Sequence, residues 1–128
     1  MATKGVHPTK AELLILRVLW QEGPLSVRDV QNTLNESKAS GYTSVLKTMQ
    51  IMTEKGLVDR DDTLRPQIYR ARYSEERTQK QLLSDLVQRA YGGSVKALVL
   101  HAIGTRKPSA EDLEAIEKLL DRFEEKRK

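Results

Sequence analysis

Residues 40–58 read Ser-Gly-Tyr-Thr-Ser-Val-Leu-Lys-Thr-Met-Gln-Ile-Met-Thr-Glu-Lys-Gly-Leu-Val, and the rest of the chain is organised around them. At about 100° per residue, a helix here gathers its apolar side chains on one side: Tyr42, Val45, Leu46, Met49 and Met52. The other side carries Thr43, Ser44, Lys47, Gln50, Ile51 and Glu54. We expect the hydroxyl of Ser40 to cap the start of this helix and Gly56 to end it in a left-handed conformation.

The polar side of this stretch opens with small hydroxyls and one lysine. Such side chains suit the acceptor-rich floor of a DNA major groove, so the pattern predicts a recognition helix with Thr43, Ser44 and Lys47 nearest the bases. Ser40 and Tyr42 at its start are candidates for contacts to the DNA backbone. A solvated surface helix has the same two-sided pattern, so the neighbouring elements must decide between the two interpretations.

The preceding residues predict two further helices. Residues 1–8 read as a loose leader, and Thr9 with Glu12 then forms a capping box. Apolar residues dominate positions 13–20, which places this first helix in the core, and Gly23-Pro24 ends it. A second, short helix begins after Ser26 and is followed by a polar turn at residues 35–39. Three helices in this order indicate a helix-turn-helix arrangement.

The residues after Gly56 change to the alternation of a strand. Residues 57–60 and 67–72 predict two short strands joined by a polar turn at residues 61–66, hence a β-hairpin and a winged helix. Arg65 near the hairpin tip is a candidate for contact with phosphate or a minor groove; a solvated surface arginine is the alternative. Asp61 and Asp62 are interpreted as turn-forming residues rather than a metal site.

Length and composition limit the class of protein. The 128 residues carry a net charge of +4, of which +3 falls in residues 1–73 and +1 in residues 74–128. This mild excess permits a polyanion as partner. Cysteine is absent, which excludes disulfides, thiolate metal sites and cysteine nucleophiles. No apolar run is long enough for a bilayer and no signal peptide opens the chain, so we expect a cytoplasmic protein without a membrane partner.

Residues 74–128 predict three more helices with apolar faces. Gly92-Gly93 separates the first from the second, and a basic turn at residues 104–108 separates the second from the third. A segment this short is too small to bury these faces within itself, and we therefore expect it to pair with a second copy. Folding back onto the first part of the chain is the alternative. The predicted domains are therefore residues 1–73 for DNA and residues 74–128 for dimerisation. The candidate dimerisation residues are Val99, Leu100, Ile103, Leu113, Ile116, Leu120 and Phe123.

Two other classes of protein compete with a DNA-binding repressor. An enzyme is disfavoured because His7 and His101 are the only histidines, and neither a nucleophile elbow nor a glycine-rich phosphate loop occurs. No cofactor is expected. A winged helix used only for protein contact is the remaining alternative, and strongly salt-dependent DNA binding separates it from a repressor.

Several segments together resemble the penicillinase and methicillin-resistance repressor family, to which the copper-transport repressors are related. They are residues 9–12 (TKAE), 18–20 (VLW), 27–30 (VRDV), 42–46 (YTSVL), 54–58 (EKGLV), 91–94 (YGGS) and 109–113 (SAEDL). The resemblance implies a homodimeric winged-helix repressor on a palindromic operator. Family members typically place a basic residue where this chain has Ile51 and a small hydroxyl where it has Lys47, so no base preference is carried over.

The resemblance also implies a way of release from DNA. In the antibiotic-resistance members a sensor protease cuts an Asn-Phe bond in the dimerisation part, and the matching bond here joins His101 to Ala102. Alanine offers a protease pocket much less apolar surface than phenylalanine. The copper-responsive relatives sense metal through cysteines, which this chain lacks. We therefore expect a poor substrate at this bond, and release through another cut site, a partner or a small ligand.

Overall fold

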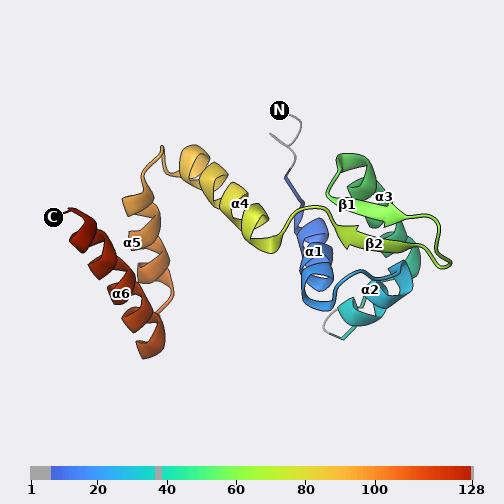
Figure 1. Ribbon diagram of the computed structural model, residues 1–128, viewed down its shortest axis with the longest axis horizontal. Helices are drawn as coiled ribbons and strands as arrows, with labels where there is room; N and C mark the ends of the chain where they lie inside the picture. The colour runs from blue at the N-terminus through green and yellow to red at the C-terminus, as the bar shows by residue number, and fades with distance from the viewer. Residues whose placement is uncertain (1–6, 37–38, 128) are drawn as a thin grey trace. The chain divides into compact units, whose positions relative to one another are not determined.

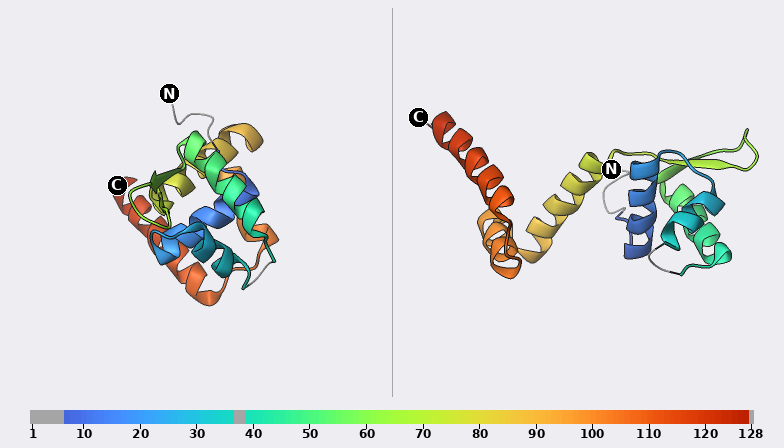
Figure 2. Two further views of the ribbon diagram at one scale, coloured as in Figure 1. Left: turned by 90° about the vertical axis from the view of Figure 1, so that its right-hand side faces the viewer. Right: turned by 90° about the horizontal axis from the view of Figure 1, so that it is seen from below.

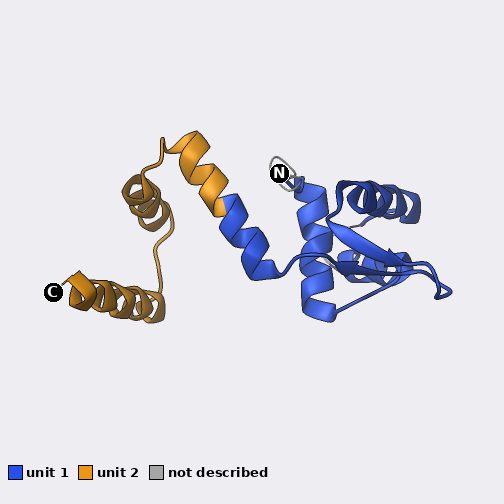
Figure 3. Cartoon of the chain, turned by 45° about the horizontal axis from the view of Figure 1, so that its top comes forward, with its two compact units in different colours: residues 1–82 blue, residues 83–128 orange. Residues whose placement is uncertain are grey.

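The structure is a computed structural model that describes residues 7–36 and 39–127. Within these residues it contains six helices and one antiparallel two-stranded sheet (Figure 1), which confirms the predicted mainly helical chain with a small hairpin. The chain divides into two compact units, residues 1–82 and 83–128, and the boundary falls inside one helix, α4 (Figure 3). Most of the predicted leader, and residues 37–38 of the predicted turn, lie outside the described residues.

The three helices of the first unit begin and end largely where their sequence signals predict. α1 spans Lys10–Glu22, α2 spans Val27–Leu34 and α3 spans Tyr42–Lys55. The predicted capping box is present: the amide of Glu12 donates to the hydroxyl of Thr9, and the amide of Thr9 donates to the Glu12 carboxylate. Ser26 caps α2 by accepting from the amide of Asp29. Each cap supplies partners for amides that the first helical turn leaves without one.

The strands that follow α3 form the predicted hairpin. β1 spans Val58–Asp61 and β2 spans Ile68–Ala71, with Val58 opposite Ala71 in the antiparallel register. Leu25, between α1 and α2, adds a bridge to Tyr69 that the sequence did not reveal: each amide donates to the other residue's carbonyl, at 3.0 and 2.8 Å. The tip of the hairpin extends beyond the three helices (Figure 2).

One core holds the first unit together. Its fully buried side chains come from all three helices and both strands: Leu16, Val30, Met49, Met52, Val58 and Tyr69. Trp20 is half-buried beside them, and its indole N–H donates to the carbonyl of Tyr73 at 3.0 Å. Because the inner side of α3 contributes to this core, packing fixes which side of the helix faces outward.

The start of α3 differs from the prediction by one residue. Gly41, not Ser40, occupies the capping position, and no side chain caps the helix there. Ser40 is held earlier, because its amide donates to Asn35 Oδ1 at 2.7 Å and its carbonyl accepts from Gln31 at 3.1 Å. These bonds fix the residues before α3 from α2 and the turn, so the helix starts one residue later than its first hydroxyl suggests.

The remaining helices are α4 (Glu75–Ala90), α5 (Val95–Thr105) and α6 (Ala110–Arg127). Ser74, Ser94 and Ser109 accept from the amides three residues later, as expected of caps. The predicted turn at residues 104–108 is shorter than expected, since α5 continues through Gly104 to Thr105. The hydroxyl of Thr105 bonds back to the carbonyl of His101 at 2.9 Å. None of the described helices has the length and hydropathy to cross a bilayer.

Candidate nucleic-acid interface

The outward side of α3 is a continuous row of exposed side chains. Thr43, Ser44, Lys47 and Gln50 are all exposed, and Ile51 is 39% exposed. The inner side is buried at Val45, Met49 and Met52. The first two turns therefore present two hydroxyls and one ammonium group to solvent, side chains that donate to or accept from base edges.

The far end of α3 is fixed by its own backbone and by α1. Gly56 has φ +82° and ψ +18°, and the amides of Gly56 and Leu57 donate to the carbonyls of Thr53 and Met52. This is the glycine-ended helix stop that the sequence predicts. Beside it, the Lys55 ammonium lies 2.9 Å from both carboxylate oxygens of Glu12, a side chain that is 4% exposed. α3 is thus joined to the first turn of α1.

The near end of α3 carries a basic residue from another helix. The guanidinium of Arg28, at the start of α2, lies 4.4 Å from the centroid of the Tyr42 ring. Both side chains are exposed, and a cation over an aromatic face is held there by the ring quadrupole. Arg28 therefore adds a positive charge at the start of α3, next to Tyr42. Sequence spacing gave no signal for it, because α2 and α3 must pack before the two residues meet.

The acidic side chains at the hairpin tip bond to neighbouring residues of the hairpin. Arg60 pairs with Asp62 at 2.6 Å, a contact that raises the pKa of Arg60. The hydroxyl and amide of Thr63 donate to Asp61 and hold the pKa of that carboxyl below its ordinary value. These contacts match the predicted role of the two aspartates as turn residues. Among the described residues no cluster of acidic or histidine side chains could hold a metal ion.

Arg65 is exposed in this turn and bonds to its own backbone. Its Nη1 donates to the carbonyls of Asp62 and Leu64, at 2.6 and 3.0 Å. The structure thus gathers five of the six predicted DNA-contacting residues at the start and on the outer face of α3. Arg65 lies apart from them on the hairpin.

The predicted dimerisation residues are apolar side chains with little cover in one chain. In residues 83–127 only one hydrophobic side chain, Val87, is buried. Leu100 is 60% exposed, and Leu120 and Phe123 are each 55% exposed. Val99, Ile103 and Leu113 are also exposed, and Ile116 is partly buried. A single chain thus leaves an apolar surface that water disfavours.

Three helices, a hairpin wing and a polar outward face on the third helix define a winged-helix DNA-binding protein. The penicillinase repressor family matches residues 8–122. The chain therefore belongs to this family, which confirms the resemblance seen in the sequence, and it is a DNA-binding repressor. A solved structure of reduced AbfR bound to DNA is 17% identical and covers 99% of this chain and 79% of that chain, with a TM-score of 0.44. The comparison with curated proteins found no match.

Proposed function

We propose that the chain is a sequence-specific transcriptional repressor that binds a palindromic operator as a homodimer. Residues 1–73 form the DNA-binding domain and residues 74–128 the dimerisation domain. α3 enters the major groove, Thr43, Ser44 and Lys47 approach the bases, and Ser40, Tyr42 and Arg65 contact the sugar-phosphate backbone. The two recognition helices then meet half-sites one or more helical turns apart.

The observation that carries this proposal is the division of α3 into two sides. A solvated surface helix needs only polar side chains outward, and long charged ones are common there. Here the first outward turns carry short hydroxyls and one lysine, and Arg28 lies over the Tyr42 ring at the start of the helix. Short side chains let a helix backbone come close to the groove floor, and the flanking cations attract phosphate.

The exposed apolar side chains of α5 and α6 support the homodimer. Burying them against a second copy removes their surface from water, and each Å² of buried apolar surface contributes about 25 cal/mol of favourable free energy. An operator with two symmetric half-sites then gains affinity from two linked readers. Repression requires only that the bound dimer occupies the site that transcription needs.

The test is selection of bound fragments from a random duplex pool by the full-length protein, followed by affinity measurements over a range of salt concentration. A palindromic consensus is expected, with affinity that falls steeply with salt as phosphate contacts release counterions. Binding without a consensus would overturn sequence specificity. Absence of DNA binding at low salt would favour the protein-contact alternative.

A further inference from the structure

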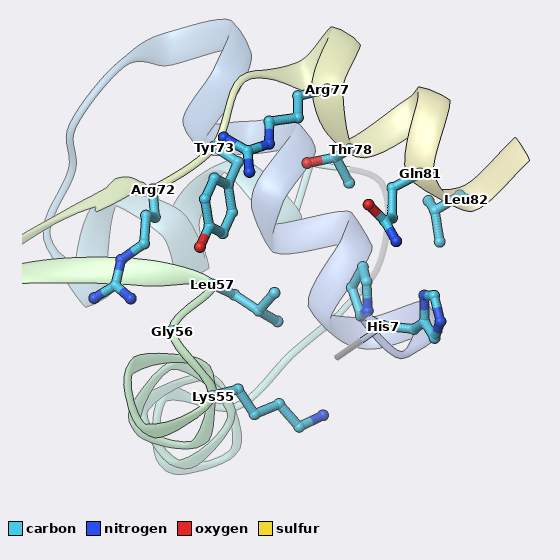
Figure 4. Close-up of a pocket in the computed structure, with 11 residues that line it drawn as sticks. His7, Lys55, Gly56, Leu57, Arg72, Tyr73, Arg77, Thr78, Gln81 and Leu82 are labelled. Atoms are coloured by element: carbon cyan, nitrogen blue, oxygen red, sulfur yellow. The ribbon is translucent and has the colours of Figure 1, made fainter. Parts of the chain in front are cut away.

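A pocket of about 100 Å³ lies in the first unit, where α3 ends and α4 begins (Figure 4). Lys55 and Gly56 line it from the end of α3, Arg72 and Tyr73 from the segment after β2, and Arg77 from α4. The remaining lining residues are His7, Pro8, Leu57, Thr78, Gln81 and Leu82. None of the DNA-contacting residues proposed above takes part in it.

The charges around this pocket have one sign. Its lining includes Lys55, Arg72 and Arg77 and no aspartate or glutamate. The partners of the first two cations are Glu12 and Asp59, which stand outside the lining. Arg77 stacks over the Tyr73 ring at 4.5 Å and makes no ion pair with a carboxylate in the described part of the chain. One positive charge at the pocket is thus left without a compensating anion.

The pocket also has an apolar wall, and Arg72 on its edge is held by an ion pair. Leu57, Leu82 and Pro8 supply carbon surface, and Thr78 and Gln81 supply hydrogen-bonding groups. A Cβ added at Gly56 would stand 2.8 Å from Nη1 of Arg72, so this guanidinium lies close against the end of α3. Asp59 accepts from Nε and Nη2 of Arg72 at 2.9 and 2.6 Å and fixes its orientation.

We propose that this pocket binds a small organic carboxylate, with the carboxylate on Arg77 and the carbon body against Leu57 and Leu82. A guanidinium fork matches a carboxylate in charge and geometry. The volume suits a small ligand, because a cavity of about 150 Å³ holds a benzene ring and this pocket is smaller. A carbon body of about three to five carbons matches that volume.

A ligand in this pocket would also weaken DNA binding, and this step rests on the proposed function. Lys55 and Gly56 end the recognition helix, and Arg72 is tied to Asp59 of the hairpin. A bound carboxylate adds negative charge at the end of α3 and therefore lowers the positive potential that attracts phosphate. By linkage, the bound carboxylate would weaken operator binding, and operator would weaken carboxylate binding by the same factor.

The experiment titrates ¹⁵N-labelled full-length protein with butyrate, with its neutral isostere butyramide and with inorganic phosphate, in the absence of DNA. Butyrate should shift the amides of Lys55, Gly56, Thr78 and Gln81, with a dissociation constant of about 1 mM. Butyramide should bind about tenfold more weakly or not at all, because it lacks the charge that Arg77 pairs with. Equal binding of butyramide, equal shifts from phosphate, or the absence of pocket shifts would each overturn the proposal.

A pair of variants on α4 provides the control. Arg77→Gln should weaken butyrate binding about tenfold, whereas Lys80→Gln, the same loss of charge on the same helix outside the lining, should leave it unchanged. An equal loss of butyrate affinity in both variants would show that only the overall charge matters, and it would overturn the proposed site. In a second arm, saturating butyrate should weaken operator affinity about fivefold. Unchanged operator affinity would rule out coupling between the pocket and DNA, but it would leave the carboxylate site standing. Failure of the protein to bind DNA at all would count against the proposed function alone.

Discussion

At the scale of single residues, Lys47 and Lys55 show how one helix uses the same side chain in two ways. Lys47 is exposed midway along the outer side of α3, where the proposed function assigns it to a base. Lys55 is turned inward to the 4%-exposed carboxylate of Glu12. Position along the helix, and not residue type, decides which lysine is available to DNA.

Replacing Lys47 with alanine should weaken binding to the selected operator by about 1–3 kcal/mol, the range of a good base contact. Folding should be unaffected because the side chain is exposed. Affinity for operator and for unrelated duplex is measured at one fixed salt concentration. Lys10→Ala is the matched control, because it removes the same charge at a different place. Lys10 begins α1, and the Glu12–Lys55 pair places this end of α1 beside the far end of α3. Undiminished affinity of Lys47→Ala would show that Lys47 makes no contact to the bases.

Replacing Lys55 with methionine should lower the free energy of unfolding by about 2 kcal/mol, because it leaves the Glu12 carboxylate buried without its counter-charge. Adding Glu12→Gln should recover part of this loss, since the uncharged amide still accepts from Thr9. Lys80→Met is the control, because Lys80 and Glu76 are each 75% exposed and such pairs contribute little. Denaturant unfolding of the wild type and the three variants checks this, and equal effects of Lys55→Met and Lys80→Met would contradict it.

At the scale of elements, local signals predicted the helices and strands because their causes are local. The Thr9–Glu12 capping box, the Gly56 stop and the change of period after it need only neighbouring residues, and all three appear in the structure. Contacts between elements were not predictable in this way. The Leu25–Tyr69 bridge, the stacking of Arg28 on Tyr42 and the pocket at Arg77 each join residues that spacing along the chain does not relate.

The start of α3 shows the same limit. Ser40 has the right side chain for a cap, but Asn35 and Gln31 hold its backbone before the helix begins. The capping position falls to Gly41, which provides no side-chain acceptor. A tertiary constraint thus overrides a local preference.

Replacing Gly41 with serine should raise the free energy of unfolding by about 0.5 kcal/mol. The backbone there is extended, with φ −78° and ψ +150°, and an added Cβ meets no atom within 4 Å. The new hydroxyl can then accept from the amide of Ser44, while the unfolded chain loses some of its freedom. Gly41→Ala is the control without an acceptor. Identical denaturation midpoints for the two variants would show that no cap forms.

At the scale of the whole molecule, the two units differ in how they bury apolar surface. Residues 1–82 enclose a core of their own, whereas residues 83–127 bury one hydrophobic side chain. The second unit therefore leaves most of its apolar side chains exposed in a single chain. The homodimer that we propose supplies the missing cover.

Replacing Leu120 with aspartate tests that interface. Leu120 is 55% exposed in one chain, so the substitution costs little in a monomer, but in the proposed dimer it buries an unpaired carboxylate. The variant should sediment as a monomer and bind the palindrome far more weakly, since two linked readers become one. Lys118→Asp, nearly opposite on α6 at 100° per residue, should stay dimeric. An intact dimer in Leu120→Asp would refute this interface, and a monomeric wild type would refute the dimer itself.

Release from DNA is the last property that the whole molecule must explain. The bond between His101 and Ala102 lies inside α5, and the Tyr91 hydroxyl lies 3.1 Å from Nδ1 of His101, within hydrogen-bonding distance. Cleavage there requires α5 to open, and alanine then offers a protease pocket little apolar surface. We expect the full-length protein to leave its operator on induction. Intact-mass measurement of the protein from induced cells, taken while operator occupancy falls, checks this. Fragments that end at His101 would overturn it, whereas intact protein would leave a bound ligand or a partner as the agent that shifts the balance between free and DNA-bound repressor.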